Sequence, residues 1–324
     1  MSQELYSRLR KQLDGYSIGF PSTDSGVEIE ILRRLFTVDD ALLFTRLTPR
    51  LEAPAQVAAR LGQDETVLAA RMDSMAERGL LFRRREAQGA RYAAIPFIHG
   101  LFEFQLKDLE PGLAGLMERY AQETNFDQAM QTSAAAFLRP IPVGRSLPVE
   151  HHVASFDDAS AILRQAGQIV LAECICRKQK QTVGKGCGKV MEACFMFGSM
   201  GQYYLDRGMG RRITLEQGLE VLAQAAEAGL VTQPGTAQNP AGMCNCCGDC
   251  CGVLVSLKKH PQPASLVFSN HQARLDRQAC TGCEACLERC QMDALTMAPD
   301  GLATINLDRC IGCGLCVTTC PGQA

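Results

Sequence analysis

The sequence predicts an α+β protein built from several domains. Its 324 residues are enough for two or three domains. In the first half of the chain, apolar residues at helical spacing give way to two short runs that read as strands. All 17 cysteines lie at or after Cys174, so the second half of the chain differs chemically from the first. These observations indicate distinct N-terminal, central and C-terminal regions.

Helices are expected through most of the N-terminal region. Val27, Ile31 and Leu35 recur at the spacing of one helical face, and a second short helix is expected over residues 41–47. The ends of two further helices are indicated by residues that favour helix termini, namely Pro54, Gly62, Asp64 and Gly79. Helices therefore come first in this region.

Two strands joined by a turn at Gln88-Gly89 are expected next, over residues 80–95. Helix, helix, turn, helix and β-hairpin is the element order of a winged helix, and residues 25–96 resemble such a domain. We therefore expect a winged-helix-like domain at residues 1–96.

The charge of this domain argues against DNA binding. Its expected recognition helix, residues 64–78, carries four acidic residues against two arginines, whereas helices that read the major groove usually carry more cations. The expected wing is basic and carries four arginines, Arg83, Arg84, Arg85 and Arg91. The whole chain, with 33 Lys and Arg against 35 Asp and Glu, has no basic bias. Packing or partner docking is favoured over DNA binding.

A helical segment and a proline-rich connection are expected over residues 97–149. One stripe of apolar residues follows Pro111 at helical spacing, formed by Leu113, Leu116, Met117 and Tyr120. Three prolines in residues 139–149 exclude a helix there, so this stretch is expected to be extended.

Residues 150–270 predict a cysteine-rich region that is mostly α-helical. Asp157 or Asp158 is expected to cap a first helix, and residues 192–206 form a second. Thr214 and Gln217 predict a capping box at the start of a third helix.

The cysteines are interpreted as metal ligands rather than disulfides. Their number is odd and the N-terminus shows no export signal, and cytosolic thiols are kept reduced. The sequence contains no run of 18 or more apolar residues, so no membrane-spanning helix is predicted. We therefore expect a cytoplasmic protein whose thiolates bind metal.

Eight cysteines form two copies of one motif. The copies are Cys280-x2-Cys283-x2-Cys286-x3-Cys290 and Cys310-x2-Cys313-x2-Cys316-x3-Cys320-Pro321. Residues 271–324 therefore resemble a bacterial two-[4Fe–4S] ferredoxin domain. The resemblance implies one cluster held by Cys280, Cys283, Cys286 and Cys320, and a second held by Cys310, Cys313, Cys316 and Cys290. Gln291 stands where the family usually has proline, a change expected to affect only the local turn.

Nine cysteines remain in the central region. They form two groups along the chain, which are Cys174, Cys176, Cys187 and Cys194, and Cys244, Cys246, Cys247, Cys250 and Cys251. Four thiols suit one cubane, and five exceed it by one. Adjacent residues such as Cys246 and Cys247 point in different directions and could face two different clusters. One cluster per group with a spare thiol, ligation that mixes the groups, a larger non-cubane cluster, zinc and uninvolved thiols stay open. One or two additional iron–sulfur clusters are favoured.

The central motif ahead of a dicluster module also resembles a group of multi-cluster iron–sulfur proteins from anaerobes that begin with a winged helix. This resemblance covers nearly the whole chain and implies electron transfer without a defined substrate. We expect an electron carrier or redox-complex subunit more than a stand-alone enzyme, as a homodimer or in a complex, with a flavoprotein or other oxidoreductase as partner. The alternatives are a redox-sensing transcriptional regulator and a reductase with an unusual central cluster.

A run of cations accompanies the first central cysteines. It holds five positive residues and no acid, namely Arg177, Lys178, Lys180, Lys185 and Lys189. The run is interpreted either as a docking face for an acidic redox partner or as solvated charge that offsets the thiolates. The GKGCGK stretch lacks the glycine and the Ser or Thr of a P-loop, because Val183 and Val190 stand there, so no nucleotide site is expected.

Overall fold

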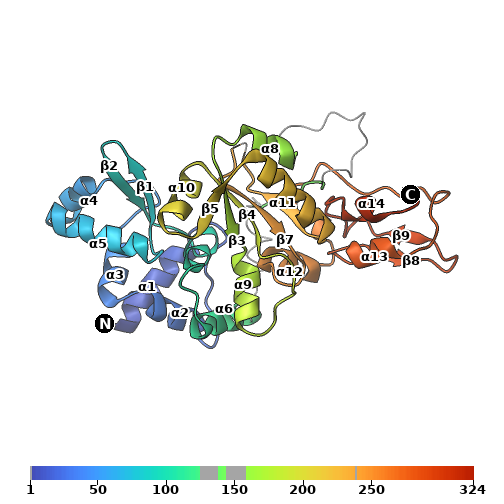
Figure 1. The fold of residues 1–324 in the computed structure, drawn as a ribbon. Coiled ribbons are helices and arrows are strands. Elements are labelled where there is room, and N and C mark those ends of the chain that lie inside the picture. The colour runs from blue at the N-terminus through green and yellow to red at the C-terminus, as the bar shows by residue number, and fades with distance from the viewer. Residues whose placement is uncertain (1, 125–137, 144–157, 238) are drawn as a thin grey trace. The chain divides into compact units, whose positions relative to one another are not determined.

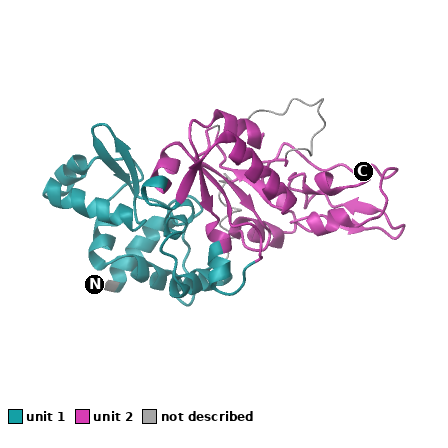
Figure 2. Cartoon of the chain, in the orientation of Figure 1, with its two compact units in different colours: residues 1–129, 178–186, 205–209 teal, residues 130–177, 187–204, 210–324 magenta. Residues whose placement is uncertain are grey.

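The computed structural model describes residues 2–124, 138–143, 158–237 and 239–324, which form two compact units (Figure 2). Unit 1 holds the described residues within 1–129 together with Lys178–Gly186 and Leu205–Met209, and unit 2 holds the other described residues. Both helices and strands are present, as the expected α+β class requires. The division into four domains is finer than these units and stays a prediction. No helix in the described ranges is long and apolar enough to cross a membrane.

Unit 1 consists mainly of helices and one β-hairpin (Figure 1). The helices are α1 (Ser2–Asp14), α2 (Val27–Leu35), α3 (Val38–Phe44), α4 (Pro54–Leu61), α5 (Glu65–Glu77) and α6 (Pro111–Glu123), with short helical turns η1 (Phe97–Leu101) and η2 (Glu103–Gln105). Strand β1 (Phe82–Glu86) pairs antiparallel with β2 (Gly89–Ala93). The elements from α2 to β2 follow the predicted order, and the winged-helix assignment itself stays a prediction.

Side-chain caps explain where two of these helices begin. The Thr37 hydroxyl accepts the N–H of Asp40 at 3.2 Å, and the Asp40 carboxylate accepts the N–H of Thr37 at 3.0 Å. This capping box starts α3 at Val38. The expected helix over 41–47 was therefore placed three residues too late. Asp64 caps α5 by accepting the N–H of Val67 at 2.9 Å, as its position in the sequence indicated.

The core of unit 1 contains a group of aromatic rings. Phe20 lies 4.2 Å from Phe97 and 4.9 Å from Tyr120 between ring centroids. Tyr120 comes from α6, where Leu113 and Met117 are also buried. The apolar stripe predicted after Pro111 is therefore the face of α6 that packs into this core.

The centre of unit 2 is a five-stranded antiparallel sheet in the order β5-β3-β4-β7-β6. Its strands are β3 (Ile169–Glu173), β4 (Glu192–Phe197), β5 (Gly210–Ile213), β6 (Val231–Pro234) and β7 (Gly242–Cys246). The expectation of a mostly α-helical middle region missed this sheet, and the helix expected over 192–206 is wrong for its first six residues. Six apolar-rich residues fit a period of 2 as well as 3.6, and β4 is fixed by pairing with β3 and β7.

The helices of the central region are α8 (Ala159–Gln165), α9 (Ile175–Thr182), α10 (Gly198–Asp206), α11 (Leu215–Glu227) and α12 (Gly252–Lys259), followed by the turn η5 (Pro263–Leu266). Two of them cover one face of the sheet. α8 and α11 pack on the face that carries Phe195, Phe197 and Met243 (Figure 1). The predicted caps of both helices are confirmed, because Asp158 caps α8 and a capping box starts α11 at Thr214.

The C-terminal part of unit 2 repeats one small pattern. Helices α13 (Ala285–Arg289) and α14 (Leu315–Thr319) each follow the start of a cysteine motif, and β8 (Leu295–Met297) pairs with β9 (Ala303–Ile305) between them. Gly312 has a φ of 72°, and a Cβ there would lie 2.1 Å from the carbonyl oxygen of His271. Only glycine fits this loop, which is why the motif carries one inside its first CxxC.

Candidate metal centres

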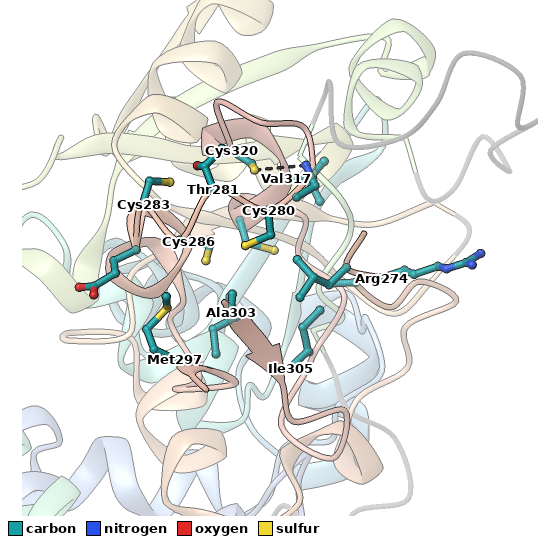
Figure 3. Close-up of a pocket in the computed structure, with 17 residues that line it drawn as sticks. Arg274, Cys280, Thr281, Cys283, Cys286, Met297, Ala303, Ile305, Val317 and Cys320 are labelled. Carbon is teal, nitrogen blue, oxygen red and sulfur yellow. Dashed lines mark hydrogen bonds between the residues drawn. The ribbon is translucent and has the colours of Figure 1, made fainter. Parts of the chain in front are cut away.

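Two pockets gather the eight C-terminal cysteines into two sets. The first pocket is lined by Cys280, Cys283, Cys286 and Cys320, and also reaches Cys316 (Figure 3). The second is lined by Cys290, Cys310, Cys313 and Cys316. The last cysteine of each motif thus joins the first three of the other motif, in the sets that the ferredoxin resemblance implied. The ligation itself stays a prediction.

Backbone N–H groups point at the sulfurs of these pockets. The N–H of Ala324 donates to Cys320 Sγ at 3.3 Å, and the N–H of Ala294 donates to Cys290 Sγ at the same distance, four residues on in each motif. The N–H of Ala273 donates to Cys310 Sγ at 3.4 Å. Such donors stabilise negative charge on sulfur, and this is what a thiolate-bound cluster requires.

Burial raises the pKa of thiols in both pockets, including Cys286 in the first. Burial raises the pKa of Cys313 to about 12 and that of Cys316 to about 11. In the first pocket, N–H groups of Ala303 and Gly282 lower the pKa of Cys280, and Cys283 is exposed. A bound metal is what allows a buried thiol such as Cys313 to lose its proton.

The central sheet places three cysteines on one of its faces. Cys194 on β4 lies directly opposite Cys244 on β7, and Cys246 lies two residues further along β7. Strand residues alternate between faces, so these three side chains lie on the face opposite the core that packs against α8 and α11.

Six thiols meet at this face and form a closed ring of contacts, which we call the six-thiol set. In order around the ring they are Cys174, Cys176, Cys251, Cys246, Cys244 and Cys194. Cys174 and Cys176 flank the start of α9, and Cys251 is the N-cap of α12. Contact with Cys176 and Cys194 lowers the pKa of Cys174, and contact with Cys176 and Cys246 lowers the pKa of Cys251. The pKa of each of the other four thiols is raised, by contact with neighbouring sulfurs and by burial, so proton loss is favoured at Cys174 and Cys251 within the ring.

The other three central cysteines form a separate group, which we call the three-thiol set. Cys187, Cys247 and Cys250 have sulfurs that all lie within 4.8 Å of one another, and Cys187 Sγ is 3.8 Å from Cys247 Sγ. Cys247 and Cys250 pack with Ala193 and Leu230. Each of the two sets thus contains cysteines from both groups seen along the chain.

A buried arginine lies next to both sets. Arg177 is only 2% exposed, and its Nη1 donates to the carbonyl oxygen of Asn245 at 3.0 Å. Its Nε and Nη2 have no hydrogen-bond partner among the described residues. Burial alone would lower the pKa of Arg177, but negative charge on Cys174, Cys194 and Cys247 outweighs burial and raises it. A buried guanidinium beside several thiols fits an anionic, thiolate-bound metal group.

Comparison with known protein families assigns the C-terminal region. Residues 273–324 match the family model of the 4Fe-4S dicluster domain. The match supports iron–sulfur clusters in this ferredoxin-type domain, and it covers a minor part of the chain. Searches of curated proteins and of solved structures find no significant match.

The dicluster domain is packed against the six-thiol set. Cys290 and Cys313 belong to the same apolar cluster as Cys246 and Cys251, together with Leu254. Cys290 and Cys313 of the second pocket and Cys246 and Cys251 of the six-thiol set therefore share one apolar cluster. The first pocket, with the exposed Cys283, has none of its four cysteines in this cluster.

Polar contacts fix the same junction. Gln291 Oε1 accepts the N–H of Gly248, in the loop between Cys247 and Cys250, at 2.7 Å. The expectation that Gln291 affects only the local turn is therefore wrong, because a proline could not make this bond. Arg289 donates to the carbonyl oxygens of Ala226 and Glu227 at the end of α11, at 2.6 Å each. Neither contact was predictable from the sequence, where only the missing proline marked Gln291.

The expected runs of cations are largely neutralised. Lys180 and Lys185 both contact the Glu118 carboxylate, at 2.5 Å and 2.9 Å, and Lys189 lies 3.6 Å from Asp249. With Arg177 buried, the run over 177–189 is not a continuous exposed docking face.

The basic wing is also paired with acids. The Arg83 side chain is fully buried, with Nη1 at 2.6 Å from both Asp73 and Glu77. Arg84 and Arg91 pair with Glu86, and Arg85 lies 3.3 Å from Asp206. The expected basic wing therefore offers little unpaired charge to a nucleic acid or an acidic partner.

Proposed function

We propose that this protein is an iron–sulfur electron-transfer protein or redox-complex subunit that relays electrons between an external partner and the central thiols. The observation that carries the proposal is the apolar cluster shared by Cys290, Cys313, Cys246 and Cys251. It supports a direct junction between the dicluster domain and the six-thiol set. The regulator alternative is less favoured, because the arginines of the wing are already ion-paired.

The proposed ligands follow the pockets. Cys280, Cys283, Cys286 and Cys320 would hold one [4Fe–4S] cluster, and Cys290, Cys310, Cys313 and Cys316 the other. When bound, such clusters supply one-electron chemistry at low potential. The six-thiol set would hold a further iron–sulfur cluster, larger than a cubane or with shared ligation, because six thiols exceed the four of a cubane.

The different exposure of the two pockets indicates the order in which electrons pass through them. Cys283 is exposed, so its pocket is the one that a redox partner can approach. The second pocket is enclosed by residues that also enclose the central thiols, among them Met292 and Leu315. Excluding water there favours transfer between buried groups, because fixed apolar surroundings reorganise little when charge moves.

The experiment compares two ligand variants in anaerobically purified full chain. Cys283→Ala should remove one low-potential EPR signal and slow reduction by an external donor, because one iron loses its protein ligand. Cys313→Ala should remove the other signal and stop reduction of the central site while leaving the cluster at Cys283 reducible. Thr281→Ala, a pocket residue without a thiol, is the control and should change neither.

The iron content of the reconstituted protein also tests the number of clusters. An iron content of only about eight per chain in reconstituted protein, which two cubanes supply, would leave the six-thiol set without a cluster and refute the relay. Central iron that is reduced at an unchanged rate in Cys313→Ala would refute the proposed order of transfer.

A further inference from the structure

We propose that Cys187, Cys247 and Cys250 bind one tetrahedral Zn²⁺ ion, with its fourth coordination position open to a ligand from solvent. This site is distinct from the six-thiol set and from both pockets of the dicluster domain. The electron relay proposed above does not depend on it.

The spacing of the sulfurs is the first argument. Thiolates bind zinc at about 2.3 Å, and a tetrahedral angle then places two of them about 3.8 Å apart. Cys187 Sγ and Cys247 Sγ are 3.8 Å apart, and all three sulfurs lie within 4.8 Å of one another. The three sulfurs are thus close enough to share a single ion.

The other thiols provide an internal comparison. Among the residues that the structure describes, the three-thiol set is the one group of three or more ligand atoms from His, Cys, Asp or Glu that meets this 4.8 Å limit. The eight cysteines with the cubane motif are described and do not meet it. Thiolates of a cubane bind separate irons at separate corners, so they stand further apart than thiolates that share one ion. The three-thiol set therefore differs from the cubane sites of the same chain.

Backbone N–H groups point at two sulfurs of the three-thiol set. The N–H of Lys189 points at the Cys187 sulfur, and the N–H of Cys250 points at the Cys247 sulfur. Three thiolates and one divalent ion leave a single negative charge. Arg177, whose charge acts on both Cys187 and Cys247, is placed to compensate it. Soft thiolate ligands in tetrahedral geometry select zinc when only one ion fits.

The fourth position is the part of the site that gives it chemistry. No described His, Cys, Asp or Glu adds a fourth ligand atom within the same limit. The nearby carboxylate of Asp249 faces Lys189 at 3.6 Å. Cys187 is half-buried, and Gly186 and Gly188 on either side of it are exposed, so solvent reaches this wall of the site. Zinc with three protein ligands and one exchangeable ligand is the arrangement of Lewis-acid sites rather than of closed structural sites.

Two adjacent cysteines allow a matched test. Cys246 belongs to the six-thiol set and Cys247 to the three-thiol set. The full chain and its variants are produced with iron and zinc in the medium, purified anaerobically and analysed for zinc, iron and acid-labile sulfide. Cys247→Ser should lose the one zinc equivalent per chain and keep iron and sulfide. Cys246→Ser should keep zinc and lose the iron of the six-thiol set.

A second variant and a second measurement guard against misfolding. Cys187→Ser changes a half-buried loop residue and should also lose zinc alone. Zinc-edge X-ray absorption of the unmodified protein should show three sulfurs at about 2.3 Å and one lighter atom.

Several results would overturn the site. Loss of about four irons with their sulfide in Cys247→Ser would make the three-thiol set part of a cluster. Four sulfurs at the zinc edge would close the fourth position, and a protein that takes up no zinc on incubation with Zn²⁺ would remove the ion. None of these outcomes bears on the EPR signals that test the electron relay.

Discussion

Replacing Glu118 with glutamine should destabilise unit 1 around the segment Lys178–Gly186, which follows Arg177 and precedes Cys187 in the chain. The Glu118 side chain is 10% exposed and accepts from Lys180 at 2.5 Å and from Lys185 at 2.9 Å. Glutamine keeps the shape of the side chain but removes its charge, so both ammonium groups lose their anionic partner.

The magnitude follows from the acidity of this carboxyl. Burial would raise the pKa of Glu118, but hydrogen bonds from Lys180, Lys185 and Gln179 outweigh burial and lower it from 4.5 to about 2. Each pKa unit corresponds to about 1.4 kcal/mol, so the ionised form adds on the order of 3 kcal/mol to stability. Lys185 is 54% exposed, and solvent screening reduces the expected loss to about 2 kcal/mol.

The pH dependence has a definite sign. Because the folded pKa lies below the unfolded one, this stabilisation is fully present above pH 4.5 and is lost as pH falls from 4.5 toward about 2. The difference in stability between the wild type and Glu118→Gln should therefore be constant from about pH 6 to about pH 8. Glu118 does not titrate in this range in either the folded or the unfolded state.

Amide hydrogen exchange of the anaerobic protein measures this difference locally. Exchange over residues 178–186 should be faster in Glu118→Gln by roughly 30-fold, the equivalent of about 2 kcal/mol. Glu123→Gln is the matched control, because Glu123 lies on the same helix in a more exposed pair with Arg119. A difference below about 0.5 kcal/mol, the worth of a surface pair, would show that water solvates both lysines and would refute the reasoning.

Three further predictions concern the dicluster junction and the N-terminal region. Gln291→Ala removes the acceptor for the Gly248 N–H and should slow reduction of the central site several-fold in stopped-flow experiments; equal rates would mean that the junction rests on apolar packing alone. Arg83→Met leaves Asp73 and Glu77 without their shared cation and should cost about 1–3 kcal/mol in anaerobic urea unfolding, whereas an unchanged midpoint would contradict the buried pairing. No DNA sequence should bind with a dissociation constant of about 10⁻⁸ to 10⁻¹¹ M, and a selected operator in that range with redox-dependent affinity would favour a regulator.

Local signals in the sequence predicted local structure well. Capping residues act within four positions of a helix start, so Asp64 and Thr214 were enough to place α5 and α11. The hairpin was likewise predicted, with its turn one residue too late, because Glu86 pairs with Gly89 and the turn is Ala87-Gln88. The resemblance of the repeated cysteine motif to ferredoxins implied the two sets of C-terminal thiols that line the two pockets, and the ligation itself stays a prediction.

Long-range pairing was not readable from the sequence. Cys194 lies opposite Cys244, fifty positions later, only because β4 pairs with β7. Distance along the chain grouped Cys187 with Cys174, whereas the fold brings it to Cys247. Ligation that mixes the two groups was among the alternatives, but the division into six and three depends on the faces of a sheet that the sequence pattern did not reveal.

The directions in which Cys246 and Cys247 point depend on the number of residues in β7. Cys246 ends the strand in the six-thiol set, and Cys247 follows it in the three-thiol set. Inserting or deleting one residue in β7 would exchange the directions of these two neighbours without changing the composition of the loop. A substitution removes a single thiol, whereas such an insertion or deletion would point two thiols in the wrong directions at once. The length of this short strand is therefore under tighter constraint than the identity of most of its residues.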